Sequence, residues 1–263
     1  MKNRIFHSDG KSFILAIDHP LTMPSPDLSD VASVIINAID GGVDAFLASY
    51  GCIRHFSRQN LFTDKGLILR ADGGSVIMGR PSGRLELLYN AEDACRVGAD
   101  ALMCMGYPGS VENASTLANV AALARQAHKC ELMCGAEMLP YGFEKHEDVD
   151  TRSVENVAFA CRLGAELGAD FIKTEFVGGY KFSEVVHNCY VPVLVLGGSK
   201  AKTEEDILAE VKDAMEAGAS GVIMGRNVVR SNSMVSLCRA IGAIIHYDVS
   251  LEQAYDILNR KRR

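Results

Sequence analysis

Hydrophobic residues along the chain fall into short runs that alternate with amphipathic segments. The runs are five to seven residues long and mostly continuous in apolar residues, which is typical of strands buried on both faces. They lie at Phe13–Asp18, Asp44–Ser49, Gly66–Ala71, Asp100–Met105, Glu131–Glu137, Asp170–Thr174, Pro192–Leu196 and Ser220–Met224. Helical periodicity falls between them at Leu28–Asp40, Leu87–Val97, Val111–Lys129, Ser153–Leu167, Glu204–Ala217 and Met234–Ile245.

One phrase recurs four times where a helical segment gives way to a strand. It reads Gly-Gly-Val-Asp at 41–44, Gly-Ala-Asp at 98–100 and 168–170, and Gly-Ala-Ser at 218–220. In each copy we expect a glycine to end the helix in the left-handed conformation before a short turn into a buried strand. The repetition indicates βα units and a parallel sheet. Eight such strands predict a single α/β domain over residues 1–263, a TIM (β/α)₈ barrel, a fold of about 250 residues.

Composition narrows the class of protein. The formal net charge is −6 with no block of like charges, so nucleic acid is not expected as a partner. No apolar stretch approaches the roughly 18 residues of a membrane span. The eight cysteines are scattered without a C-x-x-C pair, and Cys130 with Cys134 has no histidine partner at metal spacing. The seven histidines do not fall at a shared set of strand ends. We therefore expect a cytoplasmic protein with reduced thiols and no bound metal.

Lys173 is the most informative candidate for chemistry. It lies in Phe-Ile-Lys-Thr at the end of the sixth predicted strand, and the carboxyl ends of barrel strands are where active sites form. A lysine is rarely buried unless it is paired or its pKa is lowered, and a buried amine can attack carbonyl carbons. The alternative is a structural lysine that holds a carboxylate such as Glu175 or Asp18.

Two glycine-rich loops follow the seventh and eighth strands. They read Gly197-Gly198-Ser199-Lys200 and Gly225-Arg226-Asn227, and they offer backbone N–H groups where barrels frequently bind phosphate. The Arg226 guanidinium would add a charge-assisted contact. The alternative is that these glycines only form turns.

Further polar residues end the first and fifth strands. Asp18 and His19 follow the first, where Asp18 either orients a substrate hydroxyl or caps a turn. Carbon–carbon cleavage also needs a group that moves protons. Both Glu137 and Tyr141, near the end of the fifth strand, can supply it, and spacing does not choose between them. Their structural alternatives are a rim salt bridge for Glu137 and rim packing for Tyr141. Arg54, Arg80 and Arg84, in the loops after strands two and three, are candidates for a second phosphate.

Taken together, these residues resemble a known family, the archaeal-type class I fructose-bisphosphate aldolases of the deoxyribose-phosphate aldolase-like superfamily. The resemblance covers nearly the whole chain. It rests on Ala-Ile-Asp-His at 16–19, residues 93–101, Tyr107 with Gly109-Ser110, Ile-Lys-Thr at 172–174, residues 192–200 and Met-Gly-Arg-Asn at 224–227. It implies that Lys173 forms the Schiff base, that the glycine loops bind a ketose 1-phosphate, and that Asp18 assists at the reacting centre. His19 is included among the substrate-binding residues.

The resemblance also implies a homo-oligomer, such as a ring-shaped decamer, and no metal or other cofactor. The chain departs from the family after the fifth strand, where Pro140-Tyr141-Gly142 stands in place of Tyr-Pro-Arg-Gly. Related tagatose-bisphosphate-type aldolases use a glutamate at this strand end, a feature that Glu137 resembles. The eighth loop continues Val228-Val229-Arg230, without the glutamine common in the family.

The function expected from the sequence is a class I aldolase, a lyase that cleaves or forms a C–C bond in a phosphorylated, fructose-bisphosphate-like ketose and releases dihydroxyacetone phosphate. The alternative on the same scaffold is a Schiff-base transferase, a thiolase or transaldolase acting on a phosphorylated sugar or diketone. A third reading is a barrel that binds a sugar phosphate without chemistry. It needs no reactive amine, and so leaves the buried Lys173 unexplained.

Overall fold

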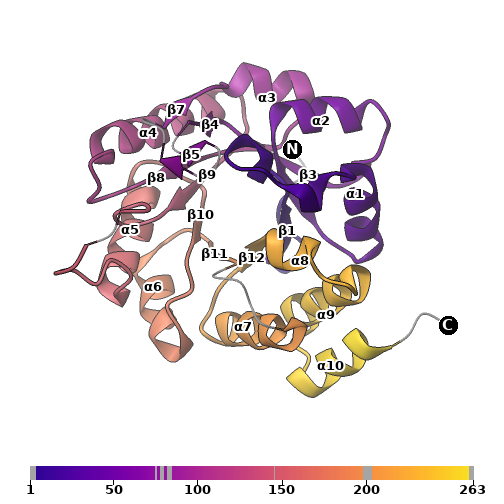
Figure 1. Cartoon of the computed structure of the whole chain (residues 1–263). Helices are drawn as coiled ribbons and strands as arrows, with labels where there is room; N and C mark the ends of the chain where they lie inside the picture. Colours follow the sequence, from indigo (N-terminus) through magenta and orange to yellow (C-terminus); the bar gives the residue numbers. More distant parts are fainter. Residues whose placement is uncertain are drawn as a thin grey trace.

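Eight parallel strands close into one barrel, in the order in which they occur along the chain. The computed structural model describes residues 4–74, 76–77, 80–81, 85–144, 146–197 and 203–260. The barrel closes because the last strand pairs with the first, with Ser12 beside Gly221. Figure 1 looks along the barrel and shows the helices as a ring around the strands. The predicted TIM barrel is confirmed.

Each predicted strand overlaps an observed one. The barrel strands are β1 (Ser12–Ala16), β2 (Ala45–Ala48), β3 (Gly66–Arg70), β8 (Ala101–Gly106), β9 (Met133–Met138), β10 (Phe171–Thr174), β11 (Val193–Leu196) and β12 (Gly221–Met224). The predicted helices are present as α1 (Val31–Asp40), α3 (Ala91–Val97), α4 (Asn113–Lys129), α5 (Val154–Glu166), α7 (Glu204–Glu216) and α9 (Met234–Tyr247). The boundaries differ by at most four residues, as frayed helix ends allow.

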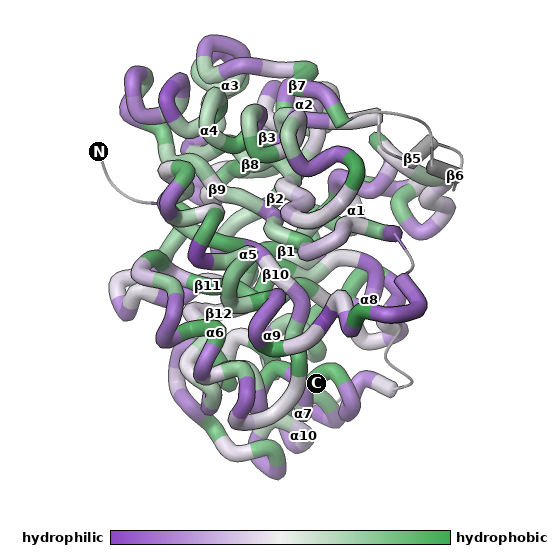
Figure 2. Tube along the Cα trace, turned by 90° about the vertical axis from the view of Figure 1, so that its left-hand side faces the viewer, coloured by the Kyte–Doolittle hydropathy of each residue, from purple (hydrophilic) through white to green (hydrophobic). Residues whose placement is uncertain are grey.

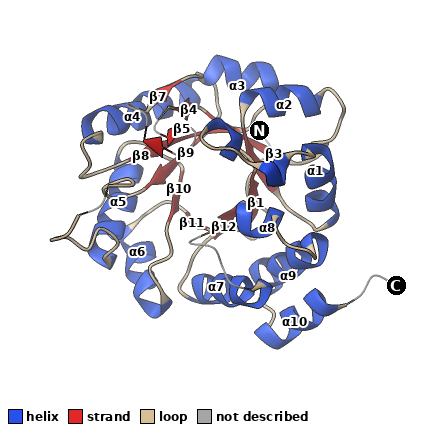
Figure 3. Ribbon diagram, in the orientation of Figure 1, coloured by secondary structure: helices blue, strands red, loops and turns tan. Residues whose placement is uncertain are grey.

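The structure adds short elements that the sequence did not predict. They are α2 (Tyr50–Ser57), α6 (Phe182–Asn188), α8 (Arg226–Val229) and α10 (Leu251–Asn259), the 3₁₀ turns η1 (His19–Leu21), η2 (Pro26–Leu28) and η3 (Gly179–Lys181), and the strands β4 (Asp72–Gly73), β5 (Val76–Ile77), β6 (Arg80–Pro81) and β7 (Glu86–Leu87). Segments this short show too little periodicity to be detected. Figure 3 separates these elements by type, and Figure 2 shows α2 near the top of the side view and α10 at the bottom. None of the helices in the described ranges combines the length and apolar character needed to span a membrane.

Alternation along each strand explains why the runs are nearly all apolar. Ile14 packs with the strand residues inside the barrel, whereas its neighbours Phe13 and Leu15 belong to the larger cluster between the strands and the helices. Both faces are therefore buried. On β10, Phe171 lies inside the barrel, so by the two-residue period Lys173 points to the same side. By the same alternation, Arg70 on β3 points to the interior of the barrel, as Ile68 does.

The repeated Gly-x-Asp phrase organises the amino-terminal end of the barrel. The glycine before each strand, such as Gly98 with φ of +73°, has the predicted left-handed conformation in all four copies. The aspartates then accept a backbone N–H of a neighbouring strand: Asp44 from Phe13 at 2.7 Å, Asp100 from Leu67 at 2.9 Å and Asp170 from Cys134 at 2.7 Å. These bonds join strand starts, which is a structural role at the end opposite the usual active site.

Candidate active site

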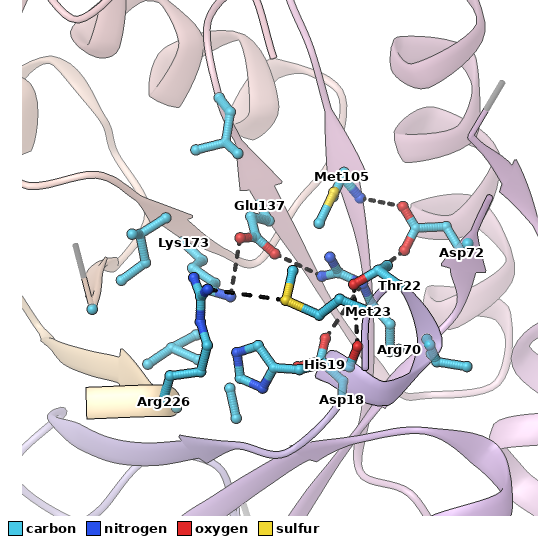
Figure 4. A pocket seen from close by; sticks show the side chains of 18 of the residues that line it. Asp18, His19, Thr22, Met23, Arg70, Asp72, Met105, Glu137, Lys173 and Arg226 are labelled. Atoms are coloured by element: carbon cyan, nitrogen blue, oxygen red, sulfur yellow. Dashed lines mark hydrogen bonds and ion pairs between the residues drawn. The ribbon is translucent and has the colours of Figure 1, made fainter. Parts of the chain in front are cut away.

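A cavity of about 500 Å³ opens at the carboxyl ends of the barrel strands. Most of the residues predicted for the site line it, although they come from strands far apart in the sequence (Figure 4). The polar lining includes Asp18, His19, Arg70, Asp72, Glu137, Lys173, Glu175, Gly197, Gly225 and Arg226. Of the predicted residues, Gly198, Ser199 and Lys200 lie outside the described residues, as does Arg84.

Lys173 is buried inside the barrel mouth and is paired. Its side chain is on the interior face of β10, and the residue is 7 % exposed. The ammonium nitrogen Nζ lies 3.0 Å from Oε1 of Glu137 on the adjacent strand β9. Glu175, the other neighbour considered from the sequence, forms an ion pair with Arg152 instead. Pairing with Glu137 thus compensates the burial of the lysine, and it places the amine within proton-transfer distance of a carboxylate.

Glu137 is held between two cations. Its Oε2 accepts a hydrogen bond of 2.7 Å from Nη1 of Arg70, while Oε1 faces Lys173. Burial by itself would raise the pKa of Glu137, but the charges of Lys173 and Arg70 outweigh burial and lower the pKa to about 2. The carboxylate is therefore ionised in the resting site. It shares the interior face with Gly135, two residues earlier on β9, where a Cβ would be 2.5 Å from the Phe171 ring.

Arg70 is a buried residue of the cavity that the sequence did not point to. It ends β3, is 5 % exposed, and places Nε 2.9 Å from Oδ1 of Asp72 and 3.6 Å from Oδ2 of Asp18. Burial would lower the pKa of Arg70, but the three surrounding carboxylates raise it well above its usual value. The signal in the sequence was the one that singled out Lys173, a charged residue at the end of a buried strand. Among arginines, we considered for phosphate only those in the loops.

Asp18 and His19 lie where β1 ends. Asp18 is 8 % exposed and faces Arg70, and its carbonyl also accepts the Leu21 N–H of the following 3₁₀ turn. Burial lowers the pKa of His19; Asp18 opposes this, while Lys173 and Arg226 add to it. Since the ordinary pKa of a histidine is near 6.5, the lowered value makes His19 a neutral donor or acceptor at neutral pH.

The eighth strand brings its loop close to His19. A Cβ on Gly225 would lie 2.2 Å from Cε1 of His19, so only glycine allows this approach. Gly225 precedes α8, and the first residue of that helix, Arg226, reaches the cavity, where its Nη1 is 3.9 Å from Sδ of Met23. Gly197, at the end of β11, lines the same region. The predicted phosphate-binding residues that are described are therefore neighbours at one side of the mouth.

Tyr141 lies apart from these groups and is absent from the described residues that line the cavity. Its backbone is in the left-handed region with φ of +61°. Its ring packs against Gly109 and, with a centroid distance of 4.9 Å, against His146. Arg152 fixes this loop by donating hydrogen bonds to the carbonyl oxygens of residues 140 and 142. Of the two candidates for proton transfer, only Glu137 lies beside Lys173 in this structure.

A set of histidine and carboxylate groups close enough to share a metal ion occurs in the described chain at the other end of the barrel. It consists of His7, Asp9 and His246. At the mouth, the arrangement offers a different chemistry: a buried primary amine, an adjacent carboxylate and a polar cavity. These are the elements of covalent catalysis on a carbonyl compound.

The comparisons with known proteins agree with this geometry. A family model described as DeoC/LacD family aldolase matches residues 12–231. The class 1 fructose-bisphosphate aldolase of Thermoproteus tenax is 32 % identical over 263 residues, covering 97 % of both chains. The 2-amino-3,7-dideoxy-D-threo-hept-6-ulosonate synthase 1 of Archaeoglobus fulgidus is 31 % identical over 248 residues, 94 % of this chain and 91 % of the relative.

The same likeness holds in three dimensions. A solved structure of a Schiff-base-forming fructose-1,6-bisphosphate aldolase superposes with a TM-score of 0.82 at 32 % identity, covering 92 % of this chain and 97 % of that one. Family model, sequence relatives and solved structure thus agree over nearly the whole barrel. This chain belongs to the DeoC/LacD aldolase family and is a class I, Schiff-base aldolase, a lyase.

Proposed function

We propose that Lys173 forms the Schiff base with a phosphorylated, fructose-bisphosphate-like ketose, which the enzyme cleaves to dihydroxyacetone phosphate and an aldehyde. The observation that carries this proposal is the 3.0 Å contact between Nζ of Lys173 and Oε1 of Glu137 inside the cavity. A paired amine at this place is poised to lose its proton to the carboxylate and to attack a ketone carbon.

Formation of the Schiff base uses one proton that passes between two groups. Glu137 accepts it from the Lys173 ammonium, and the free amine adds to C2 of the ketose to give a carbinolamine. Loss of the ammonium charge removes the main contact that lowers the pKa of Glu137, so burial then favours the protonated acid. The acid returns the proton to the carbinolamine hydroxyl, which leaves as water, and the iminium restores a positive charge beside Glu137.

Cleavage then follows from the iminium. The Glu137 carboxylate takes the proton of the C4 hydroxyl, the C4–O bond becomes a carbonyl, and the C3–C4 electron pair moves into the iminium to form an enamine. After the aldehyde leaves, Glu137 returns its proton to C3, and water hydrolyses the regenerated iminium to release dihydroxyacetone phosphate and the Lys173 amine. Glu137 is preferred to Tyr141 for these steps because it contacts Lys173.

The phosphate is assigned to the side of the mouth formed by the ends of β11 and β12. Gly197 and Gly225 expose backbone there, Arg226 supplies a cation, and the neutral His19 is a further hydrogen-bonding group. Asp18, tied to Arg70, is placed to contact a hydroxyl of the substrate. Assembly into a homo-oligomer remains a prediction from the family resemblance, which light scattering of the purified protein tests.

The same first half of the reaction also fits a transferase. The Archaeoglobus relative named as a heptulosonate synthase is as similar to this chain as the Thermoproteus aldolase, at 31 % and 32 % identity. In this second candidate, the lysine-bound unit passes to a different acceptor. The two candidates share the lysine chemistry and differ in the molecule that attacks or leaves.

The first experiment is borohydride trapping with dihydroxyacetone phosphate, followed by peptide mass mapping. A reduced adduct on Lys173, absent from Lys173→Arg, is the expected result. A screen of aldehydes, with and without coenzyme A, then separates aldolase from transferase. A folded protein that binds phosphate but gives no adduct would contradict the Schiff-base assignment of Lys173, whereas trapping only with a phosphorylated diketone would favour the transferase.

A further inference from the structure

We propose that Arg70, held by Asp72, is a positioning residue for proton transfer: it binds one oxygen of Glu137 and leaves the other facing Lys173. The proposal rests on the function proposed above, because Glu137 acts there as the proton carrier. It concerns a pair of residues that neither contributes the nucleophile nor belongs to the phosphate loops.

The two oxygens of Glu137 have separate partners. Nη1 of Arg70 lies 2.7 Å from Oε2, and Nζ of Lys173 lies 3.0 Å from Oε1 (Figure 4). A carboxylate on a flexible side chain would otherwise rotate and present either oxygen, since its last torsion is broad. With Oε2 occupied by a buried guanidinium, only Oε1 remains for exchanging a proton with the amine and, later, with the substrate.

Arg70 is itself held in place by a second carboxylate, that of Asp72. Its Nε lies 2.9 Å from Oδ1 of Asp72, which is 2 % exposed. The other oxygen of Asp72 accepts the backbone N–H of Met105 at 2.7 Å. Met105 is opposite Glu137 in the register of β8 and β9. The chain of contacts therefore runs from the backbone beside Glu137 through Asp72 and Arg70 back to the Glu137 carboxylate.

The charges around Glu137 explain why a second cation is needed. Arg70 and Lys173 face it from β3 and β10, Asp72 from β4, and Asp18 and His19 lie across the mouth from the end of β1. When Lys173 is neutral, as it must be to attack, Arg70 is the cation that still contacts Glu137. Burial and the charge of Asp72 both favour the protonated acid, so loss of Arg70 would raise the pKa of Glu137.

Asp18 extends the same arrangement toward the substrate. Its Oδ2 lies 3.6 Å from Nε of Arg70, the nitrogen that also contacts Asp72. One guanidinium thus contacts the carboxylates of both Asp18, after β1, and Glu137, on β9. These are the two carboxylates that we place against the substrate. A lysine could supply the charge but not the planar, forked set of donors.

The test compares Arg70→Met, Arg70→Lys and Asp72→Asn with Arg96→Met, an exposed arginine on α3, as the matched control. Rates are measured as a function of pH and divided by the number of sites that borohydride can trap, so that unfolded protein is not counted. For Arg70→Met we expect kcat to fall about 10²-fold or more and KM to change less than threefold. The midpoint of the acid limb in the plot of kcat against pH should move to higher pH by more than one pH unit.

The other variants separate charge from geometry. Arg70→Lys is expected to return the midpoint of the acid limb most of the way to its position in the unsubstituted enzyme. It should still leave kcat at least about tenfold low, because a lysine cannot hold two carboxylates in the same arrangement. Asp72→Asn is expected to lower kcat about tenfold without moving the midpoint of the acid limb to higher pH. If Arg70→Met does not fold, these two variants carry the test, because each retains the charge or the shape of the original side chain.

The outcomes distinguish this proposal from the one beneath it. No trapped adduct on the unsubstituted enzyme would overturn both. An adduct on the unsubstituted enzyme, together with variants whose kcat per trapped site and pH profile match it, would overturn only the role of Arg70. A loss of trappable sites with normal turnover at those that remain would make Arg70 a structural residue and would likewise overturn the proposal.

Discussion

The two ends of the barrel both place a basic side chain between carboxylates, yet they do so in different surroundings. At the carboxyl end, Arg70 lies between Asp18, Asp72 and Glu137 in a buried cavity. At the amino end, His246 is partly exposed and lies between the carboxylates of residues 9 and 44, at 2.8 and 3.0 Å.

The amino-end carboxylates also bind backbone. The carboxylate of Asp44 accepts the Phe13 N–H, and Asp9 accepts the Lys11 N–H. These groups complete hydrogen bonds of the strand starts and the amino-terminal turn, so they are used for stability. The carboxylates of Glu137 and Asp18 face other side chains in the cavity, and our proposal places them against the substrate. The comparison teaches that the role of a charged group depends on whether its partners are backbone donors or movable side chains.

The largest expected effect at the mouth is loss of the Lys173 amine. Lys173→Arg keeps a positive charge beside Glu137 but cannot form a Schiff base, so kcat should fall at least about 10³-fold with little change in the unfolding midpoint. The matched control is Lys11→Arg at the other end, where the amine donates to the Ile245 carbonyl at 3.0 Å. Near-normal turnover in Lys173→Arg, measured with the ketose phosphate that the screen identifies, would contradict the difference between the ends.

Substitution of a carboxylate should reduce activity at the carboxyl end of the barrel and stability at the amino end. Glu137→Gln is expected to lower kcat by about 10²–10⁴-fold, because an amide cannot exchange the proton. Asp170→Ala removes the acceptor for the Cys134 N–H and should reduce the free energy of unfolding by about 1–3 kcal/mol while kcat is preserved. Steady-state kinetics and denaturant unfolding of both variants check this. Equal losses of kcat in the two would remove the distinction.

Two glycines, one at the start of β12 and one directly after its end, sharpen the comparison further. Gly225→Ala would place a Cβ 2.2 Å from His19 at the mouth and should cost about 1–3 kcal/mol and raise KM. Gly221→Ala, at the strand start, combines a φ of +126° with a contact of 1.9 Å to the Ser12 carbonyl oxygen, and should cost about 3 kcal/mol or more without changing KM. Gly242→Ala, where an added Cβ would point into open space, is the control and should stabilise α9 by about 0.5–1 kcal/mol. Unchanged KM in Gly225→Ala would argue against its place beside the phosphate.

The smallest expected effect is a pH dependence at the amino end. Hydrogen bonding to Asp44 raises the pKa of His246, burial opposes the rise, and Asp9 adds to it. A raised pKa means that this contribution to stability is complete below about pH 6.5 and is lost as the pH rises through the folded-state pKa. The contribution is about 0.5–1 kcal/mol because the pair is partly exposed. Thermal unfolding of His246→Gln beside the unsubstituted enzyme should show a difference that shrinks between pH 6 and 9; a constant difference would contradict it.

At the carboxyl end of the barrel, stability changes with pH in the opposite direction. The pKa of Glu137 is lowered from 4.5 to about 2, so its contribution to stability is present above pH 4.5 and is lost as the pH falls from there toward 2. The free energy of unfolding of Glu137→Gln should therefore differ from that of the unsubstituted enzyme mainly at neutral pH. The two free energies should converge as the pH falls.

Much of this architecture could be predicted because it is local. The repeated phrase, Gly-x-Asp in three copies and Gly-Ala-Ser in the fourth, marks a helix end, a turn and a strand start within a few residues. Its four copies imply βα units and a parallel sheet, and the count of eight strands implies a barrel. Lys173 could be identified for the same reason, since a charged residue in a short apolar strand is conspicuous without any partner. The acid/base group could not be chosen, because Glu137 and Tyr141 are both near one strand end and differ only in where the loop turns.

The sequence by itself determined the barrel, the position of Lys173 at the end of the sixth strand, and the loops at which a phosphate is expected. Only the tertiary structure decided that Glu137 contacts this lysine while Tyr141 packs beside His146. Only the tertiary structure, too, placed Arg70 at the centre of three carboxylates, from the segment after β1, from β4 and from β9. The physical reason is that alternation and turn glycines are set by neighbouring residues. Ion pairs across a barrel depend instead on strand register and side-chain reach between residues distant in sequence, such as Arg70 and Glu137, which are 67 positions apart.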